Sequence, residues 1–208
     1  MLEILGRTSS INVRKVLWLA DEMALPYERQ DWGAGFRDPH EPEFLALNPN
    51  GLVPVIRDGD VVLWESNTIC RYLAGRHRRT DLLPQQPAAR AHVEQWMDWQ
   101  ATELNTAWRH VFMARVRKSP AWPDDEAAEA SAREWNRHMA ILDAQLARTG
   151  GWAAGEDFTL ADIVLGLSTH RWLQTPMAVR PALPAVQAYY QRLCARPAFQ
   201  PHGRDGPP

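Results

Sequence analysis

The first third of the chain alternates between short apolar runs and one amphipathic segment at helical spacing. Val13, Val16, Leu17, Ala20 and Met23 recur roughly every three to four residues, which predicts a helix over residues 11–24. A turn signal, Asp58-Gly59-Asp60, lies between two short apolar runs and predicts a hairpin. The expected strands are 2–5, 25–29, 53–56 and 61–63, with a mixed loop through Gly33, Gly35 and Pro39 and a further helix over 65–75.

Beyond residue 87 the pattern is helical throughout. Apolar and aromatic residues from Val93 to Phe112 line one face of a long helix, which the proline-containing segment 119–123 ends. Further helices are expected over 125–148, where Gly150-Gly151 follows, from Thr159, and from Pro184, with a loose tail over 202–208.

This order of elements predicts an α/β domain followed by an all-α domain. Strand-helix-strand and then hairpin-helix is the order of a thioredoxin-like domain (βαβαββα), in which a crossover helix joins two parallel strands. Arginine, aspartate and proline replace periodic apolar residues near residue 80. We therefore expect a thioredoxin-like domain over 1–78, a linker over 79–87 and a helical domain over 88–201.

Composition narrows the functional classes. The 208 residues are 45% hydrophobic, enough for a core, and their net charge of −2 gives no reason to expect nucleic acid or an anionic membrane as partner. No apolar run approaches 18 residues, so no membrane span is expected. Two distant cysteines are typical of reduced thiols in a cytoplasmic protein. The histidines have no paired spacing for a metal, and P-loop, dinucleotide-binding and Cys-x-x-Cys motifs are missing.

The segment Asn48–Pro54 and the pair Glu65-Ser66 carry the strongest functional signal. Val53-Pro54 joins a turn to a strand and is a candidate cis peptide, which would turn the Val53 amide and carbonyl toward an extended peptide. Glu65-Ser66 opens a helix, where unpaired backbone N–H groups attract an anion. One site would then bind a peptide backbone, a carboxylate and an ammonium group, and glutathione has all three.

The same residues resemble a known family. Asn-Pro-x-Gly-x-Val-Pro, followed by x-Asp-Gly-Asp and Leu-Trp-Glu-Ser-Asn-x-Ile-x-Arg-Tyr-Leu, is similar to the glutathione-binding half of cytosolic glutathione transferases. Residues 9–16 resemble the active-site segment of the Ser-type members, and residues 158–163 resemble the cap of a helix in the second domain. The resemblance covers nearly the whole chain and indicates a bacterial theta-, phi- or zeta-like enzyme.

Ser10 is the catalytic residue that this resemblance implies. It precedes the first helix, and the corresponding hydroxyl in the family donates a hydrogen bond to the glutathione sulfur. A free thiol has a pKa near 8.5, and lowering it by about two units requires roughly 2.7 kcal/mol, which a hydroxyl donor and a helix N-terminus together supply. Ser10 as a simple helix cap is the alternative, and Ser9 and Asn12 are the substitutes if the register differs.

The resemblance also assigns the binding residues. The resemblance implies that Ser66 binds the γ-glutamyl carboxylate of glutathione and that Glu65 binds its ammonium group. It also implies that the backbone of Val53, next to Pro54, pairs with the backbone of the ligand. His40 lies near a basic residue that some relatives use for the glycyl carboxylate, although an exposed loop histidine explains it equally. Leu52 stands where many relatives of this family have a polar residue, so one polar contact with glutathione is expected to be missing.

The helical domain is expected to hold the electrophile. Trp108 and Phe112 lie one turn apart and are candidates for its apolar pocket, whereas Trp96 and Trp99 are expected in core or interface packing. The family implies a homodimer, and the many aromatic residues agree. The predicted function is detoxifying conjugation of a small hydrophobic electrophile by glutathione thiolate. The alternatives are a glutathione-dependent isomerase resembling maleylacetoacetate isomerase and a non-catalytic glutathione-binding module.

Overall fold

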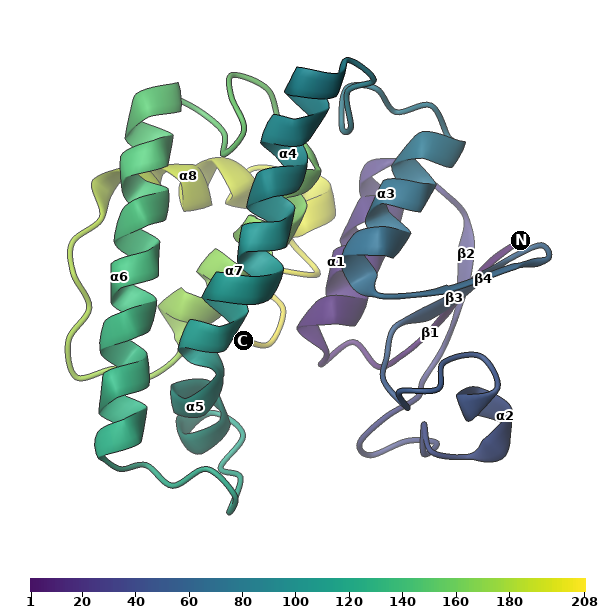
Figure 1. Cartoon of the computed structure of the whole chain (residues 1–208), viewed down its shortest axis with the longest axis horizontal. Helices are drawn as coiled ribbons and strands as arrows, with labels where there is room; N and C mark the ends of the chain where they lie inside the picture. The colour runs from purple at the N-terminus through teal and green to yellow at the C-terminus, as the bar shows by residue number, and fades with distance from the viewer.

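Four short strands form one mixed sheet in the N-terminal domain (Figure 1). The structure, a computed structural model, describes residues 1–208. The strand order is β2-β1-β3-β4, in which β1 pairs in parallel with β2 and antiparallel with β3, and β3 pairs antiparallel with β4. The strands are β1 (Leu2–Leu5), β2 (Tyr27–Gln30), β3 (Val55–Asp58) and β4 (Val61–Trp64).

The three helices of this domain cover the two faces of the sheet. Helices α1 (Ile11–Glu22) and α3 (Ser66–Arg76) pack against each other and against α7 of the second domain. The short α2 (Pro42–Leu45) lies at the other face, where its Phe44 packs with Leu5, Trp32 and Val55. The predicted thioredoxin-like arrangement is confirmed.

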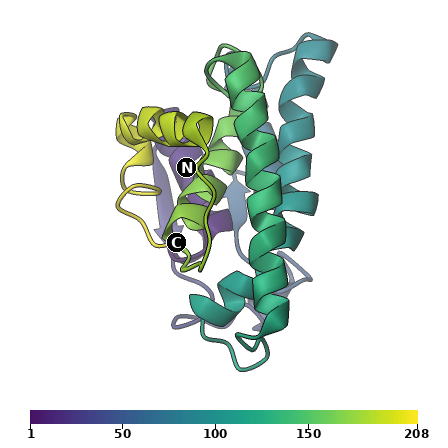
Figure 2. The same ribbon diagram turned by 90° about the vertical axis from the view of Figure 1, so that its left-hand side faces the viewer.

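The C-terminal domain is entirely helical. Helix α6 runs beside the long α4–α5 helix, and α8 lies across α6 (Figure 2). Helix α7 is central: every residue from Leu160 to Trp172 is buried, including the charged Asp162 and Arg171. No helix has the combined length and apolar character needed to cross a bilayer. The helices are α4 (Pro87–Trp99), α5 (Asn105–Arg115), α6 (Glu126–Thr149), α7 (Leu160–Gln174), α8 (Pro184–Cys194) and the 3-10 turn η2 (Pro197–Phe199).

A π-helical segment, η1 (Gln100–Leu104), joins α4 to α5. The sequence predicts one long helix here, and the chain does stay helical from Pro87 to Arg115. The π turn inserts an extra residue into the ladder, as such segments often do at functional sites. Its buried Gln100 points to the boundary with the N-terminal domain, where it meets Lys15.

The two domains share one hydrophobic core. A single cluster of 37 buried residues extends from β1 and α1 through α3 and into the helical domain, so the domains are packed as one body. Trp18 of α1 is completely buried, and a Cβ on Gly166 of α7 would lie 3.0 Å from its ring. Glycine at 166 therefore permits the close approach of α1 to α7.

The prediction of a loose C-terminal tail is wrong. Residues 201–206 form successive turns that pack on α1 and α7. Arg14 donates from Nη1 to the carbonyl of His202 (2.7 Å), and the His202 ring lies 2.5 Å from the Asp21 carboxylate. Short polar residues and glycine suggested disorder, but the buried arginine on α1 needs carbonyl acceptors, and the tail supplies them.

The start of α7 depends on a buried carboxylate. Asp162 is fully buried and accepts hydrogen bonds from the backbone N–H groups of Thr159 and Ala153, both at 2.9 Å, and from the Thr159 hydroxyl at 3.3 Å. The predicted capping role of Asp162 is confirmed, and the carboxylate also ties the preceding loop to α7.

We expect Asp162→Ala to destabilise the fold by about 2–5 kcal/mol, because it removes a helix cap and leaves two buried N–H groups without acceptors. Urea unfolding measures the loss. Asp157→Ala, which removes an exposed carboxylate just before the same helix, is the matched control and should change stability by less than about 0.5 kcal/mol. Equal effects of the two substitutions would contradict the capping role.

Candidate active site

The first turn of α1 and the Val53-Pro54 turn meet at the end of β1. Gly6 follows β1 with φ of +151°, and a Cβ there would lie 2.5 Å from a methyl of Val13 and 3.1 Å from the Cβ of Val53. Only glycine permits this approach without displacing a neighbour. The segment that carries Ser10 and the segment that carries Val53 are therefore adjacent.

Ser10 is the N-cap residue of α1, but its side chain does not cap the helix. Its backbone is extended (φ −88°, ψ 122°), its carbonyl accepts the Arg14 N–H at 3.0 Å, and its hydroxyl forms no capping bond. The hydroxyl is therefore free at the positive end of a 12-residue helix. This geometry removes the main structural explanation for a serine at this position.

The two alternatives to Ser10 differ in their surroundings. The Ser9 hydroxyl accepts a hydrogen bond from Nη1 of Arg7 (2.9 Å), and its carbonyl accepts one from Nη2 of Arg117 (2.8 Å). Asn12 lies half-buried in the first turn of α1, and its side chain has no hydrogen-bond partner within the chain. Ser9 is thus engaged by two arginines, whereas the side chains of Ser10 and Asn12 are free.

The Val53-Pro54 peptide is cis, as the sequence suggests. Neither the amide nor the carbonyl of Val53 forms a hydrogen bond within the chain, so both remain available to an extended ligand. The preceding turn is held by Asn48, whose Nδ2 donates to the Leu52 carbonyl at 2.7 Å. The ring of His40 lies against Gly51 of this turn and 2.9 Å from the Asp38 carboxylate, with its side chain 70% exposed.

Glu65 and Ser66 stand at the start of α3. Glu65 is the N-cap residue and has φ of +70°, a conformation that is costly for a residue with a side chain and concentrates at functional sites. Its side chain is exposed and makes no cap bond. Ser66 occupies the first position of the helix and is 5% exposed, and no group of the chain bonds to its hydroxyl. Both side chains and the first N–H groups of α3 are open to a ligand.

The structure places Trp108 and Phe112 in contact on α5. Their rings form an edge-to-face pair with centroids 5.3 Å apart. Trp108 is half-buried, whereas Phe112 is only 3% exposed because the guanidinium of Arg171 lies 4.0 Å from its ring centre. Trp172 is a core residue whose indole N–H donates to Asn136 at 2.8 Å.

Lys15 is a buried cation that the sequence analysis did not select. It is 1% exposed on α1, and its Nζ lies 2.7 Å from Oε1 of Gln100 and 3.3 Å from Oδ1 of Asn67. Burial lowers its pKa to about 8, with a smaller opposite effect from Cys70 and a weaker one from Glu65. The sequence feature that could have drawn attention to Lys15 is its rarity, because it is one of two lysines in a chain whose other basic residues are arginines.

Four arginines that pattern analysis missed gather next to Ser9 and Ser10. They are contributed by three separate parts of the chain: Arg7 and Arg14 near the start of α1, Arg117 after α5, and Arg171 in α7. Burial, followed by the positive charges of Arg14 and Arg117, holds the pKa of Arg171 well below its usual range. No sequence spacing connects these positions, because only the packing of the two domains brings them together.

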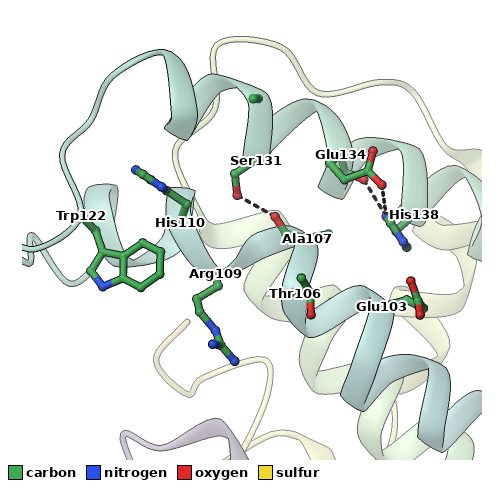
Figure 3. A pocket seen from close by; sticks show the side chains of 10 residues that line it. Glu103, Thr106, Ala107, Arg109, His110, Trp122, Ser131, Glu134 and His138 are labelled. Atoms are coloured by element: carbon green, nitrogen blue, oxygen red, sulfur yellow. Dashed lines mark hydrogen bonds and ion pairs between the residues drawn. The ribbon is translucent and has the colours of Figure 1, made fainter.

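A well-defined surface pocket lies elsewhere. It has a volume of about 560 Å³ and opens between α5 and α6, with Thr106 and Arg109 on one side and Glu134 and His138 on the other (Figure 3). None of the residues that the sequence predicts for glutathione or for the electrophile lines it.

Comparisons with known proteins agree with this arrangement. Residues 9–76 match the family described as "Glutathione S-transferase, N-terminal domain", and residues 100–197 match "Glutathione S-transferase, C-terminal domain". The chain is 41% identical over 202 residues to glutathione S-transferase GstB of Escherichia coli K12, covering 96% of each protein. It is 34% identical over 210 residues to glutathione S-transferase 3 of Zea mays, covering 96% of this chain and 91% of the relative.

Solved structures give the same result. A theta class glutathione S-transferase from Xanthomonas axonopodis pv. citri, crystallised with glutathione bound, superposes with a TM-score of 0.89 at 41% identity over 96% of this chain and 95% of that chain. Glutathione transferase F7 from Populus trichocarpa superposes with a TM-score of 0.84 at 28% identity over 96% of each chain. The match of both halves of the chain, and of their arrangement in space, shows that the protein belongs to the glutathione S-transferase family.

Proposed function

We propose that this protein is a transferase in which Ser10 holds glutathione as a thiolate for attack on an electrophile. The observation that carries the proposal is the free hydroxyl of Ser10 at the N-terminus of α1, the helix that meets the Val53 turn at Gly6. A hydroxyl donor and the helix dipole both stabilise an anionic sulfur more than a neutral thiol. The family membership and the glutathione-bound relative from Xanthomonas support the choice of thiol.

Glutathione is proposed to bind on residues 1–78. The amide and carbonyl of Val53, presented by the turn at Pro54, pair with its cysteinyl backbone, since they have no partner in the chain. Ser66 and the first N–H groups of α3 receive the γ-glutamyl carboxylate, and the exposed carboxylate of Glu65 receives the ammonium. His40, whose ring lies beside Gly51, is proposed to bind the glycyl carboxylate.

The acceptor is proposed to bind on the side of residues 88–201, which follow the linker 79–87. Trp108 supplies a half-exposed aromatic face, and Phe112 supports it from below. An apolar electrophile that stacks on Trp108 leaves water and approaches the sulfur. We assign the protein to detoxification in the cytoplasm, a reducing compartment that suits its two free thiols, Cys70 and Cys194.

A homodimer is also proposed, with contacts at β4 and the α3–α4 surface. β4 is an edge strand, and its Val61, Val62 and Trp64 are 37%, 40% and 38% exposed. An exposed apolar edge strand is unusual in a monomer, because it favours pairing with another chain. The half-buried Trp96 and Trp99 pack edge-to-face on the neighbouring α4, with ring centres 5.2 Å apart.

Substituting Ser10 tests the catalytic proposal. Ser10→Ala should raise the pKa of bound glutathione toward the free value near 8.5 and lower turnover at neutral pH, while glutathione still binds. Ultraviolet titration of the thiolate in the binary complex measures the shift. Ser9→Ala and Asn12→Ala are matched controls on the same segment, and a shift caused by either of them, in place of Ser10→Ala, would move the assignment.

Substituting Ser66 tests the binding proposal. Ser66→Ala should weaken glutathione binding by about 1.5–3 kcal/mol, because it removes a hydrogen bond to a charged carboxylate. Calorimetric titration measures the affinity. Thr68→Ala removes an exposed hydroxyl two residues later on α3 and should leave the affinity unchanged. Unchanged binding in Ser66→Ala would exclude Ser66 from the site.

Sedimentation tests the dimer. Wild-type protein at micromolar concentration should sediment at about twice the mass of one chain, and Val62→Asp should shift it to one chain, because a carboxylate would be buried at the interface. Val179→Asp, at a 74% exposed apolar position outside β4, is the control and should remain dimeric. A wild-type protein with the mass of one chain would reject the proposal.

A further inference from the structure

The acceptor side of the site carries an unusual concentration of positive charge. Arg7 and Arg117 hold Ser9 from two directions, one through its hydroxyl and one through its carbonyl. Arg117 lies beyond the end of α5, so it reaches across from the helical domain to the residue next to Ser10. Arg117 is exposed, and the remaining N–H groups of its guanidinium have no partner within the chain.

Two further arginines lie behind this pair. Arg14 and Arg171 are 1% and 2% exposed, and both donate to the same oxygen of Pro208, the last residue of the sequence, at 3.2 and 3.5 Å. The guanidinium of Arg171 also covers the rings of Phe112 and Trp108, with centroid distances of 4.0 and 4.6 Å. The Nε atoms of both arginines are buried without a hydrogen-bond partner.

No aspartate or glutamate side chain compensates these charges. Arg7, Arg14, Arg117 and Arg171 take part in none of the salt bridges of the chain, although most other arginines pair with aspartate or glutamate. The positive charges of Arg7, Arg14 and Arg117 are close enough to depress the pKa values of their neighbours, after the larger effect of burial. Arg7 and Arg117 bind neither an acidic side chain nor the Pro208 oxygen, so an anion that enters the site can pair with both of them.

Glutathione thiolate supplies one negative charge beside Ser10, but two cations without an acidic partner, Arg7 and Arg117, lie next to it. The most accessible of them, Arg117, belongs to the domain on which the acceptor is expected and presents a planar fork suited to a carboxylate. The aromatic pair beside Arg171 receives the apolar part of the same molecule. From these contacts we propose that the acceptor is an electrophile with an anionic group, such as a carboxylate, which binds Arg117 with the support of Arg7 while its apolar part lies on Trp108.

The inference rests on the proposed transferase function and names its substrate class. In the reaction, the glutathione sulfur forms a bond to the electrophilic carbon, the bond from that carbon to a halide breaks, and the halide leaves with the electron pair. The anionic group takes no part in bond making. The contact between the anionic group and Arg117 places the electrophilic carbon near the sulfur and therefore raises kcat/KM.

The test compares two aryl halides that differ only in charge. They are chlorodinitrobenzoate, with its carboxylate opposite the chloride, and its uncharged methyl ester, and each rate is divided by the rate with free glutathione thiolate. Wild-type enzyme should prefer the acid. Arg117→Gln should lower the acid-to-ester ratio of kcat/KM roughly tenfold to a hundredfold, mainly through KM, because a hydrogen-bonded charge pair is lost.

Matched variants isolate the role of Arg117. Arg109→Gln removes the same charge from an exposed position on α5, beside the α5–α6 pocket (Figure 3), and should leave the ratio unchanged. Arg117→Lys keeps the charge without the fork and should retain part of the preference. Arg7→Gln gives an independent second reduction if Arg117→Gln proves unstable in thermal unfolding.

Several results would overturn the inference. Arg117→Gln that slows acid and ester equally, while raising the pKa or the Kd of bound glutathione, would make the arginines part of the glutathione site. Wild-type enzyme that conjugates the ester without preferring the acid would reject the anionic acceptor and leave the transferase function intact. Wild-type enzyme that accelerates neither reaction would reject both proposals.

Discussion

The burial of Lys15 is the interaction on which the junction of the two domains depends. An ammonium group inside a protein requires acceptors on every side that lacks water, and here they come from Asn67 of α3 and Gln100 of the π segment. Asn67 in turn donates to the carbonyl of Met97 at 2.8 Å, and Gln100 donates to Asn105 at 2.8 Å. Three helices from two domains therefore satisfy one another's polar groups around a single charge.

This polar chain connects the two halves of the proposed active site. Asn67 follows Ser66, at the proposed glutathione carboxylate, and Asn105 accepts the indole N–H of Trp108 at 3.1 Å. A change in Lys15 or Gln100 would therefore alter the start of α3 and the acceptor wall together. The cost of leaving any member of such a network unpaired keeps its geometry fixed.

The sequence predicts the parts of this protein whose signals are local. The strands around Asp58-Gly59-Asp60, the cap at Asp162 and the turn before Pro54 are all encoded within a few residues, and the structure agrees with each. Boundaries move by a few residues, as for β3, which begins at Val55 and not at Val53. The proposed roles of Ser10 and Ser66 remain predictions that now have a consistent geometry.

The sequence does not predict which charged side chains from distant parts of the chain are brought together by tertiary packing. Arg7 and Arg171 are 164 positions apart in the numbering, and an arginine-rich chain offers no reason to select either. The tail shows the same limitation, because residues with disorder-like composition become ordered where a buried guanidinium needs their carbonyl groups. In both cases the decisive partner lies in a distant element.

The π segment has a consequence for how this protein can change. An α-helix transmits any rotation along its whole length, so a straight helix from Pro87 to Arg115 would couple the face of α4 to the face of α5. The extra residue between Gln100 and Leu104 separates the two registers. Substitutions that reshape the proposed acceptor wall on α5 can therefore accumulate without rotating Trp96 and Trp99 on α4. The two ends of one continuous helix can then change independently.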